Sequence, residues 1–317
     1  MTTTELTIKQ SEACLELANH IKENLYNSLA PATREMYRRD FYIFTQWCEK
    51  MGLERCPASP ETVAGFITAE DLRGIKPATL VHRLAAIKKA HEAYGHHSPT
   101  NHAVVKGVLK GIKRNRGTAP NKKAAATAER LEQMVSYCIP TTLGVRDKAL
   151  LLLGFAGAFR RSELVALTMK DIERTPEGIK VTIRKSKGDQ EGKGQTIAIL
   201  NGTRFRVVDH LFFWLKHAGI KEGLIFRSVL KSGKVQDKPL MAKDVARLVK
   251  KYAGFAGFSV ENFAGHSLRA GFITSGANAG ADIMKLMEVS RHKKPETVIG
   301  YVRESKLFDN HAGEKFL

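Results

Sequence analysis

The segment that decides both the fold and the chemistry of this chain runs from residue 265 to residue 303. It contains, in order, the stretches GHSLR (265–269), SRH (290–292) and GYVR (300–303). These stretches supply imidazole and guanidinium groups, which bind anions, and one phenol oxygen, which can act as a nucleophile. The pattern therefore indicates an anion-binding site with a candidate nucleophile, formed by His266, Arg269, His292 and Tyr301.

The local signals around these residues predict three short helices. Ser267 is a candidate N-cap, so His266 and Arg269 would lie together at the start of a helix, where both can face one anion. A second helix is expected over Asp282–Val289. A third is expected from Pro295, because proline is favoured at the first helical position. The turns between these helices would bring the four candidate residues together.

The composition favours a nucleic-acid partner. The chain has 317 residues, enough for two domains, and its 51 Lys and Arg against 32 Asp and Glu give a formal charge of +19. Nucleic acid is the first expected partner and an anionic membrane surface the second. The 4 cysteines form no CxxC pair, and no apolar run is long enough to cross a bilayer. We expect a cytoplasmic protein, associated with the nucleoid if it is bacterial.

Residues 1–116 are predicted to form a helical DNA-binding domain, with helix starts at Pro31, Pro60 and Pro77. From Arg73 to Ala126 there are twelve Lys or Arg and one acid. Such a concentrated excess of positive charge is typical of a phosphate-binding surface. The expected contacts are Arg83, Lys88, Lys106, Lys110 and Lys113. Histidines also occur in this region, but no acids or cysteines lie at ligand spacing, so we expect no metal site.

Residues 117–127 are predicted to be a linker, which would let two basic domains close around DNA, and residues 128–317 form the second domain. Alternating apolar residues predict strands over 171–173, 179–184 and 195–200, within a mostly helical sequence. The fold class is therefore mainly α with a small antiparallel β-sheet. A basic helix over 241–252 offers Lys243 and Arg247 as candidates for the major groove.

Two arginines, two histidines, a hairpin lysine and a tyrosine suit attack on a DNA phosphodiester. Fixed guanidinium groups can hold the charged non-bridging oxygens without a metal, and a lysine could give a proton to the leaving oxygen. Each residue taken alone has a simpler explanation, such as a surface ion pair for Arg160. Residue types alone support a basic DNA-binding protein and leave open whether it catalyses phosphoryl transfer.

A resemblance narrows the choice. The segments FRRSEL (159–164) and HSLR (266–269), and His292 followed nine residues later by Tyr301, resemble the signature of the tyrosine recombinase (phage integrase) family. The helical module before them resembles the SAM-like core-binding domain of Cre-like members. The resemblance covers about the whole chain. It implies a site-specific recombinase that needs no cofactor or metal and cleaves DNA through a 3′-phosphotyrosyl intermediate.

The same resemblance implies a role for each matching residue. Arg160 and Arg269 would bind the scissile phosphate, His266 would assist proton transfer, and His292 would donate a hydrogen bond to a non-bridging oxygen. Tyr301 would be the nucleophile. Among three lysines near the hairpin, the sequence context favours Lys187 as the donor to the leaving 5′ oxygen. Glu163 would orient the first arginine and the histidine.

The resemblance also implies partners. We expect double-stranded DNA with inverted-repeat sites, a dimer on each site, a tetramer when two sites are joined, and no membrane. The tail Lys306–Leu317, with Leu307 and Phe308 as anchors, is the expected contact between protomers. Three alternatives stay open: a type IB topoisomerase-like nicking and closing enzyme, a non-catalytic DNA-binding protein of the same fold, and, least favoured, a metal-dependent nuclease.

Overall fold

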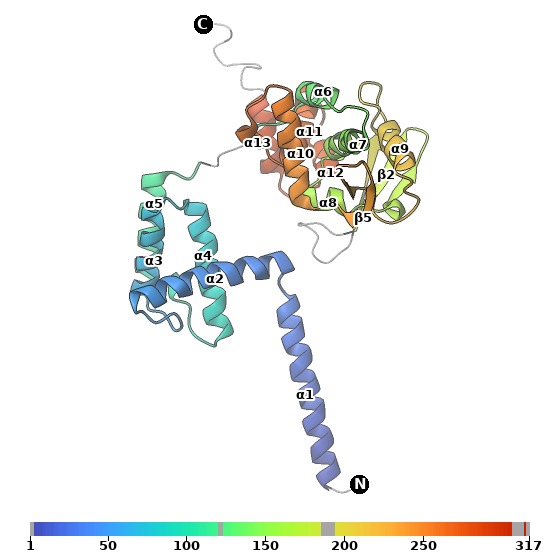
Figure 1. Cartoon of the computed structure of the whole chain (residues 1–317). Helices are drawn as coiled ribbons and strands as arrows, with labels where there is room; N and C mark the ends of the chain where they lie inside the picture. Colours follow the sequence, from blue (N-terminus) through green and yellow to red (C-terminus); the bar gives the residue numbers. More distant parts are fainter. Residues whose placement is uncertain (1–2, 120–122, 185–193, 306–313, 315–317) are drawn as a thin grey trace. The chain divides into compact units, whose positions relative to one another are not determined.

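The computed structural model describes all residues except 1–2, 120–122, 185–193, 306–313 and 315–317. The described chain divides into two compact units, Met1–Asn121 and Lys122–Leu317 (Figure 1). Each unit contains its own hydrophobic core. Helices dominate both units, and small antiparallel sheets occur in the second, which confirms the predicted fold class. Within the described residues, no helix combines the length and the apolar character that a bilayer span requires.

The first unit is entirely helical in its described part. Its elements are α1 (Thr3–Asn27), α2 (Pro31–Met51), α3 (Pro60–Leu72), α4 (Pro77–Ala93), the short turn η1 (Pro99–Asn101) and α5 (Ala103–Arg116). The predicted starts of α2, α3 and α4 are confirmed, since each helix begins at its proline. Helix α1 was not separated from the rest of this region in the sequence analysis.

The core of the first unit forms where α2, α3 and α4 meet. Phe44, Phe66 and Ile87 are fully buried there, and the rings of Phe44 and Phe66 pack edge to face with centroids 5.1 Å apart. The Ser59 hydroxyl accepts a hydrogen bond from the Thr62 amide at 3.1 Å, and so caps α3. These contacts fix the helices against one another and leave α5 to present a basic face.

The second unit contains the remaining elements. In chain order they are α6 (Ala128–Ser136), α7 (Thr142–Ala156), α8 (Arg161–Ala166), η2 (Met169–Asp171), β1 (Ile172–Arg174), β2 (Gly178–Ile183), β3 (Gln195–Leu200), α9 (Val207–His217), β4 (Arg227–Val229), β5 (Val235–Pro239), α10 (Ala242–Phe255), η3 (Val260–Asn262), α11 (Ser267–Asn278), α12 (Ile283–Ser290) and α13 (Pro295–Ser305). Both expected helices after residue 280 are present, and α13 begins at Pro295 as predicted.

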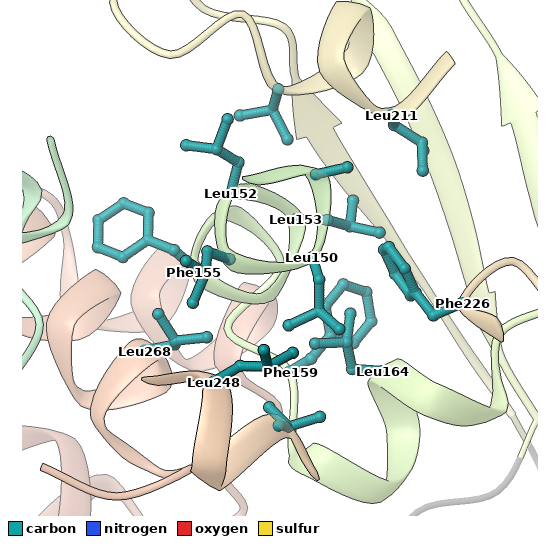
Figure 2. Close-up of a cluster of buried hydrophobic side chains, with 14 of the residues drawn as sticks. Leu150, Leu152, Leu153, Phe155, Phe159, Leu164, Leu211, Phe226, Leu248 and Leu268 are labelled. Carbon is teal, nitrogen blue, oxygen red and sulfur yellow. The ribbon is translucent and has the colours of Figure 1, made fainter. Parts of the chain in front are cut away.

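Helix α7 lies in the middle of the core of this unit. Leu150, Leu153 and their neighbours in α7 are buried, because the helix carries apolar residues on all sides. Figure 2 shows these side chains packed against Leu164 of α8 and Leu268 of α11. Leu211, Phe226 and Leu248 belong to the same core. The C-terminal end of α7 therefore lies beside the beginnings of α8 and α11.

The main sheet has the order β1-β2-β3, and both pairings are antiparallel. Ile179 pairs with Ile199 and Val181 pairs with Ile197, so the alternating apolar residues occupy one buried face. The strand expected over 195–200 is confirmed. The hairpin of β4 and β5 was missed, because neither short strand shows a clear apolar alternation. Lys187 lies outside the described residues.

The end of the predicted linker packs onto the second unit. The Ala124 amide donates to the Asn262 carbonyl at 2.6 Å, and the Ala126 amide donates to the Ser267 carbonyl at 2.9 Å. A Cβ atom on Gly271 would lie 1.9 Å from the Ala126 carbonyl oxygen, so only glycine permits this approach. Of residues 117–127, the part after residue 122 therefore runs against the start of α11.

Candidate active site

Helix α11 positions two of the candidate residues. His266 occupies the N-cap position with helical backbone angles, and Arg269 lies one turn further on. The expectation that Ser267 caps this helix is wrong. Ser267 is the first helical residue, and its hydroxyl accepts a hydrogen bond from the preceding Ala264 amide at 3.0 Å. The serine stabilises the turn that leads into α11, and this turn places His266 beside the helix start.

Helix α8 positions Arg160 and Glu163. The Glu163 carboxylate accepts a hydrogen bond from the Arg160 amide at 2.9 Å and another from Arg160 Nη1 at 2.6 Å. Glu163 is buried, whereas 22% of the Arg160 side chain is exposed. A charged hydrogen bond to the side chain, together with one to the backbone of the same residue, restricts the rotamer of the arginine. The carboxylate therefore fixes Arg160 while leaving part of its guanidinium accessible.

Arg269 is fully buried and lies beside His292. Its Nη1 donates to the Ala158 carbonyl at 2.8 Å, and its Nη2 lies 3.4 Å from each ring nitrogen of His292. Among the described residues, Nε of Arg269 has no hydrogen-bond acceptor. Burial, then the charges of Arg160 and Arg291, lower the pKa of Arg269 to about 9, so it stays protonated at neutral pH. A buried cation with an unpaired N–H is suited to binding an anion.

His292 follows α12 and is half buried. Its Nδ1 lies 2.8 Å from the hydroxyl oxygen of Ser290. Burial, followed by the charges of Arg269 and Arg160, lowers the pKa of His292 to about 3, so the ring is neutral at pH 7. When Ser290 donates this hydrogen bond, the single ring proton resides on Nε2, which is then the donor available to a ligand.

Tyr301 lies in α13, and its hydroxyl is 3.3 Å from Nε2 of His266. Desolvation, then the charges of Arg269 and Arg160, lower the pKa of His266, although part of this side chain remains exposed. A neutral imidazole can accept the phenol proton. The structure thus pairs a candidate nucleophile with a candidate base, as the activation of a weak nucleophile requires.

Sequence reasoning missed one member of this cluster, Arg291. Its buried Nη2 donates to Glu163 at 2.9 Å and to the Ala158 carbonyl at 2.9 Å. Burial raises the pKa of Glu163, but Arg291 and the hydrogen bonds from Arg160 outweigh burial and hold it below its ordinary value. The only signal in the sequence was a charged residue between Ser290 and His292, and a charge in a turn usually indicates a solvated surface.

The structure thus brings together six of the seven predicted catalytic residues: Arg160, Glu163, His266, Arg269, His292 and Tyr301. The seventh, Lys187, lies outside the described residues, as do Leu307 and Phe308 of the expected tail contact. Among the described residues, no group of three or more His, Cys, Asp or Glu side chains is arranged to hold a metal ion.

The candidate DNA-binding residues are placed differently from one another. Lys106 and Lys110 are exposed on α5, Lys113 is half buried, and none of these three forms an ion pair in the described part of the chain. Lys88 is exposed on α4, and Lys243 and Arg247 are exposed on α10. Lys88 and Arg247 each contact an acid of their own helix.

Arg83 differs from the expectation. Its side chain is 10% exposed and contacts the buried carboxylate of Glu70 directly. The residue lies on the inner face of α4, where the helical period places it toward α3. Counting basic residues along the sequence could not distinguish this buried arginine from basic residues on the surface. Arg83 is therefore a structural residue of the helical unit and not an exposed phosphate contact.

A cluster of guanidinium and imidazole groups beside one tyrosine, in a chain of formal charge +19, indicates an enzyme that transfers phosphoryl groups of DNA. Residues 125–307 match the model of the phage integrase family. The chain is 38% identical, over 299 residues, to an integrase/recombinase XerD homolog of Selenomonas ruminantium, covering 92% of this chain and 87% of that protein. The chain belongs to the phage integrase family and is a site-specific tyrosine recombinase.

Other recombinases and integrases are also similar to this chain. The XerD tyrosine recombinase of Yersinia pestis is 26% identical over 278 residues, covering 86% of this chain and 87% of that protein. Among solved structures, the Tn1549 transposon integrase with transposon right end DNA has a TM-score of 0.61 at 17% identity, covering 90% of this chain and 92% of that one. A lambda integrase dimer on a core site has a TM-score of 0.59 at 16% identity, covering 90% and 75%. These likenesses do not favour the topoisomerase alternative.

Proposed function

We propose that this recombinase cuts and rejoins DNA with Tyr301 as the nucleophile. The Tyr301 oxygen attacks the scissile phosphorus, the bond from phosphorus to the 5′ oxygen breaks, and the enzyme is left on the 3′ phosphate. The phenol proton passes to His266, and the leaving 5′ oxygen takes a proton from Lys187. Attack by a 5′ hydroxyl on the phosphotyrosine reverses these steps. The bond energy is kept in the protein linkage, so no nucleotide triphosphate is consumed.

Arg160, Arg269 and His292 would stabilise the charge that develops on the non-bridging oxygens. Removal of one such preorganised donor typically lowers the rate by about 100-fold to 1000-fold. The observation that carries this proposal is the 3.3 Å contact between Tyr301 and His266, next to an arginine with an unpaired, buried Nε. Because Arg269 is fully buried, a phosphate reaches it only after some of the covering side chains shift.

The test is to trap the covalent intermediate. A nicked DNA substrate loses its 5′ hydroxyl fragment after cleavage, so the phosphotyrosine accumulates and can be mapped by mass spectrometry. Tyr301→Phe should bind the same DNA and form no adduct, while Tyr137→Phe, an exposed tyrosine in the same unit, should behave as wild type. An adduct in the Tyr301 variant, or a wild-type adduct on another residue, would refute the assignment.

We also propose that two protomers bind each inverted-repeat site and that four take part when two sites are joined, with the tail Lys306–Leu317 as the contact. The solved lambda integrase neighbour is a dimer on a core site, and a solved XerH recombinase is bound to a palindromic difH substrate, with a TM-score of 0.59 to this chain. Native mass spectrometry on DNA with one or two half-sites tests the stoichiometry. One protomer on a complete site would contradict it.

The DNA contacts are proposed to come from α5 and α10. Lys106 and Lys110 extend from α5 without ion-pair partners in the described chain, so each can replace a counterion on a phosphate. Lys243 and Arg247 on α10 are proposed to reach base edges. We propose that the protein acts in the cytoplasm, in association with the nucleoid if the cell is bacterial.

A further inference from the structure

Arg291 has a backbone conformation that is unusual for its residue type. Its φ is 57°, in the left-handed region, where it ends α12 as the C-cap. Glycine commonly occupies such positions because any side chain there costs about 1 kcal/mol or more. Only three described non-glycine residues have positive φ, and two of them, Ala158 and Arg291, lie in this cluster. A strained arginine therefore needs contacts that offset the strain.

Besides a hydrogen bond to the Val289 carbonyl of its own helix, the contacts of Arg291 lead toward the phosphate site. Its Nη1 donates to the Gly157 carbonyl at 2.9 Å, and its Nη2 donates to the Ala158 carbonyl and the Glu163 carboxylate, each at 2.9 Å. The guanidinium also lies over the Phe159 ring, 5.2 Å from its centroid. Arg291 is thus bound along the whole turn that joins α7 to α8, and it is 8% exposed.

Two of these acceptors are shared with the residues that would hold the phosphate. The Ala158 carbonyl accepts from both Arg291 and Arg269, and the Glu163 carboxylate accepts from both Arg291 and Arg160. The backbone carbonyl of Arg291 also lies 3.5 Å from Nη2 of Arg160. The Arg291 side chain therefore connects Glu163, which binds Arg160, to the Ala158 carbonyl, which binds Arg269. The next residue along the backbone is His292.

We propose that Arg291 is a positioning residue for recombination, which sets the separation of Arg160 and Arg269 and the place of His292 without touching DNA. This inference rests on the proposed roles of those three residues. The planar fork of a guanidinium binds several acceptors in fixed directions, which an ammonium group cannot do. Misplacement of a catalytic group by about 1 Å can reduce a rate by about 100-fold.

The experiment compares three variants of the full chain in single-turnover cleavage at saturating DNA. Arg291→Gly removes the fork and suits the positive φ, so the backbone turn is preserved. Arg291→Lys keeps a charge and the strain. The matched control is Arg206→Gly, because Arg206 also has a positive φ (44°) and pairs with an acid, Asp209, away from the site.

We expect Arg291→Gly to lower the cleavage rate by about 100-fold with little change in DNA affinity, since most affinity comes from backbone phosphates elsewhere. Arg291→Lys should recover only part of the rate, and Arg206→Gly should match wild type. On DNA whose scissile phosphate is a methylphosphonate, which lacks the negative charge, the loss from Arg291→Gly should shrink to under about tenfold, because the phosphate arginines then contribute less.

The outcomes separate the possible failures. Equal rates for wild type and Arg291→Gly would overturn the proposal, as would full recovery by Arg291→Lys, which would make charge alone sufficient. A loss of the same size on phosphate and methylphosphonate DNA would also overturn it, because that is the result of general destabilisation. If wild type forms no adduct at Tyr301, the proposed function itself fails, and this is seen before any variant of Arg291 is measured.

Discussion

Replacing Glu163 with glutamine should uncouple the two arginines that share this carboxylate. Glu163 is 3% exposed and accepts hydrogen bonds from the Arg160 amide, from Arg160 Nη1 and from Arg291 Nη2. Glutamine keeps one acceptor oxygen but turns the other into an N–H₂ group, which would face a donor. Breaking a buried ion pair on one side typically costs about 3–5 kcal/mol. We expect the free energy of unfolding of the second unit to fall by about that amount at pH 7.

The pH dependence of this loss has a defined sign. The folded-state pKa of Glu163 lies below its ordinary value, because its cationic partners outweigh the effect of burial. The unfolded carboxyl titrates at about 4.3, so its stabilising contribution is fully present above that pH and is lost as pH falls through the folded value. The difference between wild type and Glu163→Gln should therefore be constant from about pH 7 to pH 5 and shrink at lower pH.

The assay can follow the second unit alone. The chain has 2 tryptophans, Trp47 in the first unit and Trp214, which is fully buried, in the second. In a Trp47→Phe background, urea unfolding reported by Trp214 gives the stability of the second unit at each pH. Glu177→Gln, at an exposed turn of the same unit, is the control. A loss below about 1 kcal/mol at neutral pH, or a loss that stays the same into acid, would refute this reasoning.

Three further outcomes are expected. Gly271→Ala should destabilise the second unit by about 2 kcal/mol or more in urea unfolding, because its Cβ would lie 1.9 Å from the Ala126 carbonyl oxygen. Lys110→Ala should reduce the slope of log affinity against log salt by about 1 in DNA titrations, whereas Arg83→Ala should lower stability and leave that slope unchanged. Inorganic phosphate should raise the unfolding temperature of the second unit, and Arg160→Met should weaken this effect, as calorimetry would show.

Much of the site could be anticipated from the order of residues along the chain. The proline signal located the start of α13, and the short turn between α12 and α13 leaves few places for Tyr301. The expected cap at Ser267 placed His266 and Arg269 at one helix start, although the N-cap residue is His266 itself. Such inferences succeed because they depend on local backbone preferences that neighbouring residues do not override.

The remainder depended on tertiary contacts that leave no mark in the sequence. The positive φ of Ala158 and Arg291 is imposed by packing, since neither residue favours it. In the same way, Arg206 adopts a left-handed conformation just before α9, which begins at Val207. Arg83 was assigned to the surface for a related reason: counting charges cannot reveal that Glu70 lies opposite it inside the unit.

The charge balance of the cluster explains why it suits a phosphate better when that phosphate is reacting. Three guanidinium groups, those of Arg160, Arg269 and Arg291, lie near the single carboxylate of Glu163, which accepts hydrogen bonds from Arg160 and Arg291, so three positive charges against one negative leave two in excess. Excess buried charge is costly: burial, and then the charges of Arg160 and Arg291, lower the pKa of Arg269. A phosphodiester offers one negative charge, but the five-coordinate species formed by attack of a phenolate offers two. On the proposed mechanism the phenol proton moves to His266, so the net charge of the site is unchanged. The guanidinium groups nevertheless face a larger negative charge on the phosphate oxygens as the bond to Tyr301 forms, and binding that strengthens toward the transition state is what accelerates a reaction.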